Sequence, residues 1–355
     1  MHEGARILTI CNACRYCEGY CAVFPALERR MNFASADLNY LANLCHNCAE
    51  CYYACQYAPP HEFAVNVPKT LAEIRAQSYQ HYAWPAPLST VFRKNSLVVS
   101  LFLLLALIIW IAATNRSTAA AAQFYQVVSH RTMVAVFGAV SLFILISLTI
   151  GVIHFWRESG EGAADMAALK DGLYDVLRLT YLYDAGQGCT YPQEGRSLGR
   201  WFFHQLTFYG FLLCFASTTI AAIYHYVFLW RAPYGYRSLP VVLGTIGGIG
   251  LLAGPAGLFW LKQRADLATR DPTQDGMDLA FIALLFTTSA TGLLLLALRE
   301  TSVMPALLAI HLATVLALFL TLPYGKFVHA IYRLAALVRY ALERSHAKGR
   351  NTTGH

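Results

Sequence analysis

The sequence predicts an all-α membrane protein in which a cysteine-rich N-terminal head precedes a bundle of six transmembrane helices. Of the 355 residues, 57% are hydrophobic and only 13% are charged, whereas soluble globular proteins carry about 25% charged residues. Eight of the ten cysteines lie within the first 55 residues, and long apolar runs begin at Leu97. The chain therefore has two parts, of which only the second is apolar enough for a bilayer.

The change in composition divides the chain into segments. We expect a head over 1–66, an interfacial linker over 67–95, a six-helix transmembrane domain over 96–340 with an inner loop at 156–203, and a flexible C-terminal tail over 341–355. The opening stretch MHEGARILTICNAC lacks the apolar core of a signal peptide. We therefore expect the head in the cytoplasm, where disulfides are rare and thiols are available to metals.

The head contains the spacing C-x2-C-x2-C-x3-C twice. The first copy consists of Cys11, Cys14, Cys17 and Cys21, and the second of Cys45, Cys48, Cys51 and Cys55. In ferredoxins with two clusters, the fourth cysteine of such a run ligates the other cluster. The spacing therefore predicts two [4Fe–4S] clusters with crossed ligands, one on Cys11, Cys14, Cys17 and Cys55, and one on Cys45, Cys48, Cys51 and Cys21.

Zinc sites and disulfides fit these cysteines less well. Structural zinc sites pair C-x2-C motifs across a longer loop, so a third cysteine beside each pair would be superfluous. A disulfide framework conflicts with a reducing compartment. Between the two copies, Leu38, Leu41 and Leu44 follow helical spacing, which favours an α-helical ferredoxin arrangement. For His46, inside the second copy, we expect a hydrogen bond or a surface position rather than a metal.

Six apolar runs are long enough to cross a bilayer, which takes about 20 residues. They lie near 97–113, 132–155, 205–229, 239–261, 278–298 and 303–325. With the N-terminus inside, the 27 Lys and Arg residues divide into six in the first 75 residues, sixteen on the inner side and five on the outer side. This asymmetry follows the positive-inside rule. We therefore expect a bacterial inner-membrane protein with both termini in the cytoplasm.

Histidines in these runs are candidate haem ligands, because ionisable groups at membrane depth are costly and usually functional. His311 and His329, both assigned to the sixth run, are 18 residues or five helical turns apart and should face the same side. His204 and His225 bracket the third run. Since the third run crosses outward and the sixth inward, we expect His225 to meet His311 near the outer side. His204 should likewise meet His329 near the inner side.

Two such pairs would form the bis-histidine sites of a cytochrome b, so we expect one or two haem b groups. His154 competes with His204 for the inner site, and His130 competes with His225 for the outer site. Histidines at helix ends also commonly lie at the membrane interface and bind nothing. That alternative stays open for His130, His154, His204 and His329.

Two further features carry structural expectations. The inner loop 156–203 ends in a stretch rich in Gly, Pro and polar residues, so we expect an ordered loop rather than a helix. Cys189 in this loop has no neighbouring ligand residue, and we expect a structural thiol. The glycine-rich run 244–257 lies inside an apolar run with no strand before it. It therefore indicates close approach of helices rather than dinucleotide binding.

Four longer stretches resemble the tricarballylate-utilisation protein B family, also known as the citrate-utilisation protein B family. They are CNACRYCEGYCAVFPALE, DLNYLANLCHNCAECYYACQYAPPHEFAVNVPKTLAEIR, HQLTFYGFLLCFAST and LALFLTLPYGKFVHAIYR. The resemblance covers nearly the whole chain and implies a heterodisulfide-reductase-type ferredoxin joined to a membrane cytochrome. It further implies that the protein reoxidises a flavin-dependent tricarballylate dehydrogenase and passes electrons to the membrane quinone pool. Tricarballylate itself would bind that partner.

Two different functions remain as alternatives. One is a haem-free iron–sulfur membrane anchor, and the other is a tricarboxylate transporter with an iron–sulfur sensor head. The apolar runs show no inverted repeat of broken helices and few buried basic residues, which disfavours a transporter. Basic residues lie mostly at the ends of apolar runs, a pattern of membrane topology rather than of nucleic-acid binding. With no acid–base or nucleophilic constellation in view, we expect cofactors to carry the chemistry.

Overall fold

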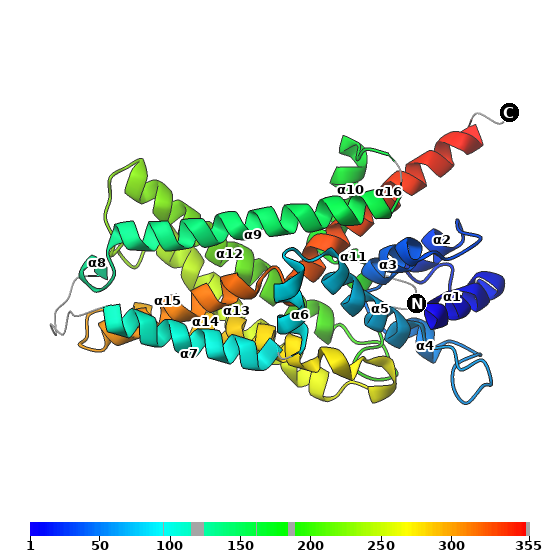
Figure 1. The fold of residues 1–355 in the computed structure, drawn as a ribbon, viewed down its shortest axis with the longest axis horizontal. Coiled ribbons are helices and arrows are strands. Elements are labelled where there is room, and N and C mark those ends of the chain that lie inside the picture. Colours follow the sequence, from blue (N-terminus) through cyan, green and yellow to red (C-terminus); the bar gives the residue numbers. More distant parts are fainter. Residues whose placement is uncertain (95, 115–123, 161, 184–188, 353–355) are drawn as a thin grey trace.

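The computed structural model describes residues 1–94, 96–114, 124–160, 162–183 and 189–352, and no strand occurs in these ranges (Figure 1). The head contains α1 (His2–Cys14), α2 (Val23–Leu27), α3 (Ser35–Leu44), α4 (Glu50–Tyr53) and α5 (Val67–Tyr82). The long apolar helices are α7 (Ser96–Thr114), α9 (His130–Glu158), α12 (Gly199–Tyr226), α13 (Leu239–Gln263), α14 (Asp275–Ala297) and α15 (Met304–Thr321). The remaining elements are α6 (Ala86–Lys94), α8 (Phe124–Val127), α10 (Met166–Arg178), α11 (Thr180–Tyr183), η1 (Leu267–Thr269), η2 (Pro272–Gln274) and α16 (Val328–Thr352).

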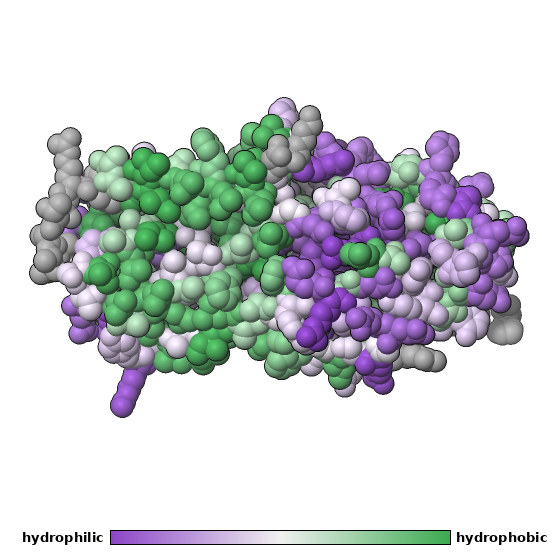
Figure 2. Space-filling model, turned by 90° about the horizontal axis from the view of Figure 1, so that it is seen from below, coloured by the Kyte–Doolittle hydropathy of each residue, from purple (hydrophilic) through white to green (hydrophobic). Residues whose placement is uncertain are grey.

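Six helices in the described part of the chain are long and apolar enough to cross a membrane. They are α7, α9, α12, α13, α14 with the preceding η2, and α15, and they coincide with the six expected runs. They run roughly along the long axis of the molecule, with the head at one end (Figure 1). On the face shown in Figure 2, hydrophobic side chains cover most of the half that contains these helices, and hydrophilic side chains gather over the other half. The predicted all-α fold with six long apolar helices is confirmed.

The helices of the head share one apolar core. Its most deeply buried side chains include Ile7, Leu8, Leu27, Leu41 and Leu71. The start of α5 is fixed by Asn66, whose side-chain oxygen accepts a hydrogen bond from Lys69 N (3.2 Å), and by Pro68 in the first turn. Although α5 lies in the range expected as an interfacial linker, it packs into the core of the head.

The core of the head continues into the rest of the chain beyond α5, which contains the six long apolar helices and which we call the membrane part. Phe155 of α9 is fully buried and contacts the rings of Tyr82 in α5 and Tyr332 in α16, with ring centroids 5.4 and 5.8 Å away. An ion pair of 2.7 Å joins Glu343 of α16 to Arg30 of the head. Apolar and ionic contacts together therefore hold the head against α9 and α16.

The sixth apolar run does not continue as one helix to residue 329, as the histidine spacing assumed. α15 ends at Thr321, and α16 begins at Val328. Pro323 cannot donate a backbone hydrogen bond to a continuing helix, and Gly325 N instead closes a turn onto Thr321 O (2.8 Å). His311 and His329 therefore lie on different helices, and the expected five-turn alignment is wrong.

The inner loop contains helices that its composition did not predict. α10 and α11 fold within it, and Asp165 caps α10 by accepting a hydrogen bond from Ala168 N (2.6 Å). The residues at 184–188, part of the Gly-rich stretch, lie outside the described residues. The expectation of a loop without a helix is therefore wrong for the first half of this segment.

The C-terminal segment is helical over most of the range where a flexible tail was expected. α16 extends to Thr352, and residues 353–355 lie outside the described residues. Its Val338 lies so close to Gly172 of α10 that a Cβ at position 172 would be 2.9 Å from Val338 N. α10 and α16 thus pack backbone against backbone beside the head.

The glycine-rich run of α13 packs against α12. A Cβ at Gly247 would lie 2.8 Å from Gly210 O, and a Cβ at Gly254 would lie 2.6 Å from Thr207 N. Both distances are shorter than van der Waals contact, so the observed spacing of the two helices requires glycine at these positions. The expectation that small residues bring two helices close together is confirmed.

Candidate redox centres

Two cavities in the head are lined by the eight motif cysteines. The first is lined by Cys11, Cys14, Cys17, Cys51 and Cys55. The second is lined by Cys21, Cys45, Cys48 and Cys51. The fold therefore places the fourth cysteine of each motif beside the first three cysteines of the other, which is the arrangement that crossed ligation requires.

Both cavities are partly open to solvent. Within the described ranges, no three His, Cys, Asp or Glu side chains converge as ligands of one ion, and the ten cysteines are free thiols. The four cysteines at each cavity, in the spacing of two-cluster ferredoxins, favour an iron–sulfur cluster there over mononuclear zinc.

The cavity thiols are poorly solvated. Burial raises the pKa of Cys11, Cys17 and Cys48 to about 12. The thiolate form of Cys55 raises the pKa of Cys11 and Cys17 further, because like charges repel across the first cavity. Since the thiolate is the form that binds iron, a cationic metal group must stabilise it here and must displace protons on binding.

The loop of the second motif presents a backbone donor to a cysteine sulfur. Asn47 has a left-handed conformation (φ 54°), which asparagine adopts more readily than most residues. This turn directs the Asn47 N–H to Cys45 Sγ (3.4 Å). Hydrogen bonds to cluster sulfurs are one of the factors that set the reduction potential.

Residues of the membrane part hold this second loop in place. Arg200 of α12 donates to Asn47 O (2.6 Å), and Thr190 N donates to Cys48 O (3.1 Å). Cys189 is buried beside the same Cys48 carbonyl, with its Sγ 3.8 Å from the oxygen, and it does not line the second cavity. Its position agrees with the structural role expected for it.

The loop of the first motif lies at the free end of the head. Its side chains bond locally: Asn12 Nδ2 donates to Arg30 O (2.9 Å), and Arg15 Nε donates to Asn12 O (3.2 Å). Tyr16, which also lines the first cavity, is 65% exposed. The first cavity therefore lies near the molecular surface, whereas the loop of the second is bound to the membrane part.

His46 is buried and hydrogen-bonded, in keeping with the role expected for it. Its Nδ1 lies 2.9 Å from Leu44 O. Burial lowers the pKa of His46 well below its usual value, and the positive charges of Arg333 and Arg200 lower it further. The imidazole is therefore neutral at physiological pH.

α12 and α16 bring His204 and His329 together. The ring centroids are 6.0 Å apart, with the ring planes at 84°. His329 Nδ1 lies 2.5 Å from Lys326 O, which leaves Nε2 as the free nitrogen. His204 Nδ1 is buried and has no hydrogen-bond partner among the described residues. Two such imidazoles facing each other across two helices fit the donor set of a bis-histidine haem. His154, the expected competitor, is exposed on α9.

The outer histidines are not arranged as a second pair of this kind. His225 stacks on His130 with centroids 4.1 Å apart and planes at 18°, which leaves no room for iron between the rings. His311 instead lies beside Thr291, with Nδ1 3.1 Å from Thr291 Oγ1. Among the described side chains, the ring contacts of His225 do not include His311. These residues do not fit a second bis-histidine haem.

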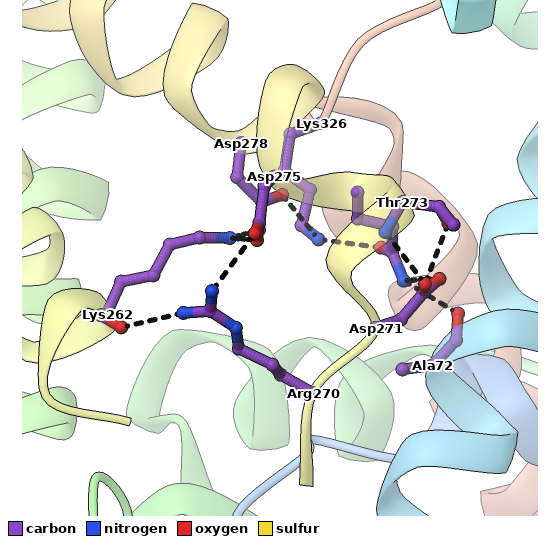
Figure 3. Close-up of polar contacts among 9 residues, drawn as sticks. Ala72, Lys262, Arg270, Asp271, Thr273, Asp275, Asp278 and Lys326 are labelled. Atoms are coloured by element: carbon purple, nitrogen blue, oxygen red, sulfur yellow. Dashed lines mark hydrogen bonds and ion pairs between the residues drawn. The ribbon is translucent and has the colours of Figure 1, made fainter. Parts of the chain in front are cut away.

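A partly buried ionic network lies where α13 and α14 approach the head (Figure 3). Asp278 pairs with Lys262 and with Lys326, the latter at 2.8 Å. Lys326 also donates to Gln274 Oε1 (3.1 Å), and Gln274 Nε2 donates to a backbone carbonyl of α5 (2.8 Å). The network thereby fixes the connection between α15 and α16. This connection includes Lys326 O, the carbonyl oxygen that His329 Nδ1 contacts.

Comparison with known proteins agrees with these features. Residues 84–350 match the family model described as Citrate utilization protein B, and residues 4–81 match the model of its Fer4-like domain. The chain belongs to the citrate utilization protein B family. Citrate utilization protein B of Escherichia coli is 48% identical over 359 residues, which cover 99% of this chain and 95% of that protein. No solved structure matches the chain.

Membership of the citrate utilization protein B family confirms the resemblance drawn from the sequence. The Fer4-like description of residues 4–81 agrees with an iron–sulfur head that carries two four-cysteine motifs. The two family models meet near residue 82, where α5 ends.

Sequence reasoning missed three arginines that reach the second loop. Arg75 of α5, Arg200 of α12 and Arg333 of α16 all donate to its backbone carbonyls. A signal was present, because Arg200 precedes His204 by four residues and Arg333 follows His329 by four. Side chains four residues apart share a helix face, so a histidine pair predicts that the two arginines lie together as well.

Proposed function

We propose that this family member carries electrons from a flavin-dependent tricarballylate dehydrogenase, through two [4Fe–4S] clusters and one haem b, to a membrane quinone. The proposal rests on the order in which groups of candidate ligand residues follow one another along the molecule. Two four-cysteine cavities in the head are followed by the His204–His329 pair at the head-proximal end of the apolar helices. The donor enzyme is inferred from the family resemblance.

The cysteines around each cavity are the proposed cluster ligands. One cluster takes Cys11, Cys14, Cys17 and Cys55, and the other takes Cys45, Cys48, Cys51 and Cys21. Such clusters, like haem, carry one electron at a time, while the protein supplies burial, spacing and orientation. Two of them in one head can accommodate both electrons that a reduced flavin delivers.

The contacts of the two loops support an order of transfer. The first cavity lies near the surface beside Tyr16, where a soluble flavoprotein can dock. The second loop is bonded to α12 through Arg200, one helical turn from His204. Electrons therefore enter at the first cavity and leave from the second toward the membrane.

His204 and His329 are the proposed axial ligands of the haem. Lys326 O orients His329 by accepting its Nδ1–H, and this contact presents Nε2 to the iron side. Because the outer histidines do not fit a second site, we propose one haem. A quinone that takes up two electrons also needs two protons to become a quinol, and the hydrophilic head side offers access to water (Figure 2).

The haem is tested by its content in purified variants. His204→Ala and His329→Ala should each abolish the b-type α-band and the extractable haem, whereas the matched control His154→Ala should retain both, because His154 is exposed on α9. A wild-type protein with clusters but no haem would support the haem-free anchor instead. Uptake of tricarballylate by proteoliposomes without an electron donor would support the transporter.

We further propose that the protein lies in a bacterial inner membrane with its head and both termini in the cytoplasm. The excess of Lys and Arg on the head side supports this topology, although Arg116, counted on the outer side, lies outside the described residues. A reporter that is active only outside the cytoplasm should work when inserted between α12 and α13. It should fail at the C-terminus, and the reverse pattern would contradict the topology.

A further inference from the structure

Two arginines, the buried Arg75 and the partly buried Arg333, donate to one carbonyl of the second cluster loop. Cys45 O accepts a hydrogen bond from Arg75 Nη1 (2.6 Å) and another from Arg333 Nη2. Arg75 belongs to the head, and Arg333 belongs to α16, so the donors come from two separate elements. Both positively charged side chains therefore contact the backbone of Cys45, a proposed cluster ligand.

A third guanidinium completes this group from the membrane part. Arg200 of α12 donates to Asn47 O (2.6 Å), and the N–H of Asn47 points at Cys45 Sγ (3.4 Å). Arg200 therefore helps to hold the peptide that donates to the cysteine sulfur. We refer to Arg75, Arg200 and Arg333 as the arginine collar.

The surroundings of the first cavity differ in charge. Arg15 is exposed, and its charge acts on the nearby carboxylate of Glu28, which also faces Glu18. Solvent screens such exposed charges, whereas buried charges are screened much less. The carboxylate of Glu50 does not create a difference between the cavities, because it acts on Cys17 of the first and on Cys48 of the second.

We propose that the arginine collar raises the reduction potential of the second cluster above that of the first, and so makes electron transfer within the head run toward the membrane. This inference rests on the proposed function, because it requires both clusters. Adding an electron makes a cluster more negative, and nearby positive charge stabilises that state. The collar residues are positioning residues, since they act through the cluster loop.

The collar keeps its charge under physiological conditions. Arginine side chains are not deprotonated in proteins, so Arg75, Arg200 and Arg333 are positively charged at neutral pH. In the proposed step, the reduced first cluster loses one electron, the oxidised second cluster gains it, and no proton or bond is transferred.

The test is a redox titration of the purified full-length protein, followed by the electron paramagnetic resonance signals of the two clusters. Cys14→Ala and Cys48→Ala, which remove one ligand from each set, assign the signals. Arg333→Gln and Arg200→Gln can still donate a hydrogen bond but carry no charge. Arg6→Gln is the matched control, because Arg6 lies on the head surface and pairs with Glu3.

We expect the second cluster to have the higher potential in the wild-type protein. Each collar variant should lower the equilibrium constant for electron transfer from the first to the second cluster about tenfold, or about 59 mV for a one-electron couple. Arg333→Lys should restore most of the loss, because it restores the charge. Arg6→Gln should change nothing.

Three results would overturn the inference. They are equal or inverted potentials in the wild-type protein, unchanged potentials in both glutamine variants, and a loss in Arg333→Lys as large as in Arg333→Gln. If the Arg333→Gln protein loses its second cluster, the potential measured in Arg200→Gln tests the inference by itself, because that variant leaves both donors to Cys45 O in place. A wild-type protein without any cluster signal would instead refute the proposed function, so the two failures are distinguishable.

Discussion

Replacing Gly254 of α13 with alanine should displace the segment of α12 that carries His204. A Cβ at position 254 would overlap Thr207 Oγ1 and would lie 2.6 Å from Thr207 N and 2.9 Å from Phe203 O. The last two atoms are backbone, and the Thr207 hydroxyl is committed to Phe203 O (2.9 Å). The clash therefore cannot be relieved by rotation of a flexible side chain, and the helices must separate.

The size of the displacement follows from the distances. Ordinary contact begins near 3.4 Å, so the backbone of α12 must move by about 0.8 Å, or 3.4 minus 2.6 Å. Overpacking of this kind costs about 1–3 kcal/mol, whereas metal–ligand distances tolerate only about 0.2 Å. Gly254→Ala should therefore lower both the apparent unfolding temperature in detergent and the haem bound per chain.

Gly138→Ala in α9 is the matched control, because a Cβ there would have no atom of the described residues within 4 Å. It should keep the unfolding temperature and haem content of the wild-type protein. Haem content is measured as the reduced pyridine complex, and unfolding is followed by intrinsic fluorescence. A Gly254→Ala protein with wild-type values in both assays would refute the reasoning, and a fall in stability with full haem would refute its link to His204.

Three more predictions follow from the described contacts. Cys17→Ala should lower iron and acid-labile sulfide per chain by about half, whereas Cys189→Ala should leave both unchanged; an equal effect of the two would contradict the ligand assignment. Asp278→Ala should destabilise the protein by about 1–3 kcal/mol, because it leaves the partly buried Lys326 without its counter-ion. Combining it with Lys326→Met should recover part of that loss in thermal unfolding, and no recovery would show that the pairing is not the cause. Because the pKa of Cys17 is raised to about 12 and iron binds the thiolate, cluster reconstitution into the apo-protein should strengthen as pH rises from 6 to 9, and a pH-independent yield would contradict this linkage.

The six long helices were predictable because the local amino-acid composition is enough to identify a candidate membrane span. A run of apolar residues identifies a span whatever its neighbours are. The grouping of the cysteines followed from the chemistry of the motif, since the crossed arrangement is a property of the spacing. Both predictions needed no knowledge of how distant segments meet.

The histidine geometry was predicted only in part, because it depends on the rotation of each helix about its axis. His204 and His329 meet as expected, although the continuous helix assumed for His329 is broken after Thr321. His225 faces His130 rather than His311. Apolar composition is nearly uniform around such helices, so the sequence does not indicate which face turns toward a neighbour.

The helix α10 was missed for a different reason. Its signals are present, with Asp165 as the N-cap and a run of helix-forming residues after it. They lie beside a stretch rich in Gly and Pro, which determined the interpretation of the whole loop. For the arginine collar, the spacing of Arg200 and Arg333 from the paired histidines was a signal that we did not use, whereas only the folded chain brings Arg75 of α5 to the same loop.

Rapid mixing under anaerobic conditions is the most direct test of electron transfer from the proposed clusters in the head to the proposed haem between α12 and α16. The wild-type protein, in lipid nanodiscs that contain quinone, is mixed with a reduced flavoprotein donor, and the absorbance of clusters and haem is followed. Our account predicts that the clusters are reduced first, that the haem band follows, and that quinol accumulates only with His204 and His329 intact. Quinol formed at the wild-type rate in the His329→Ala protein would contradict it.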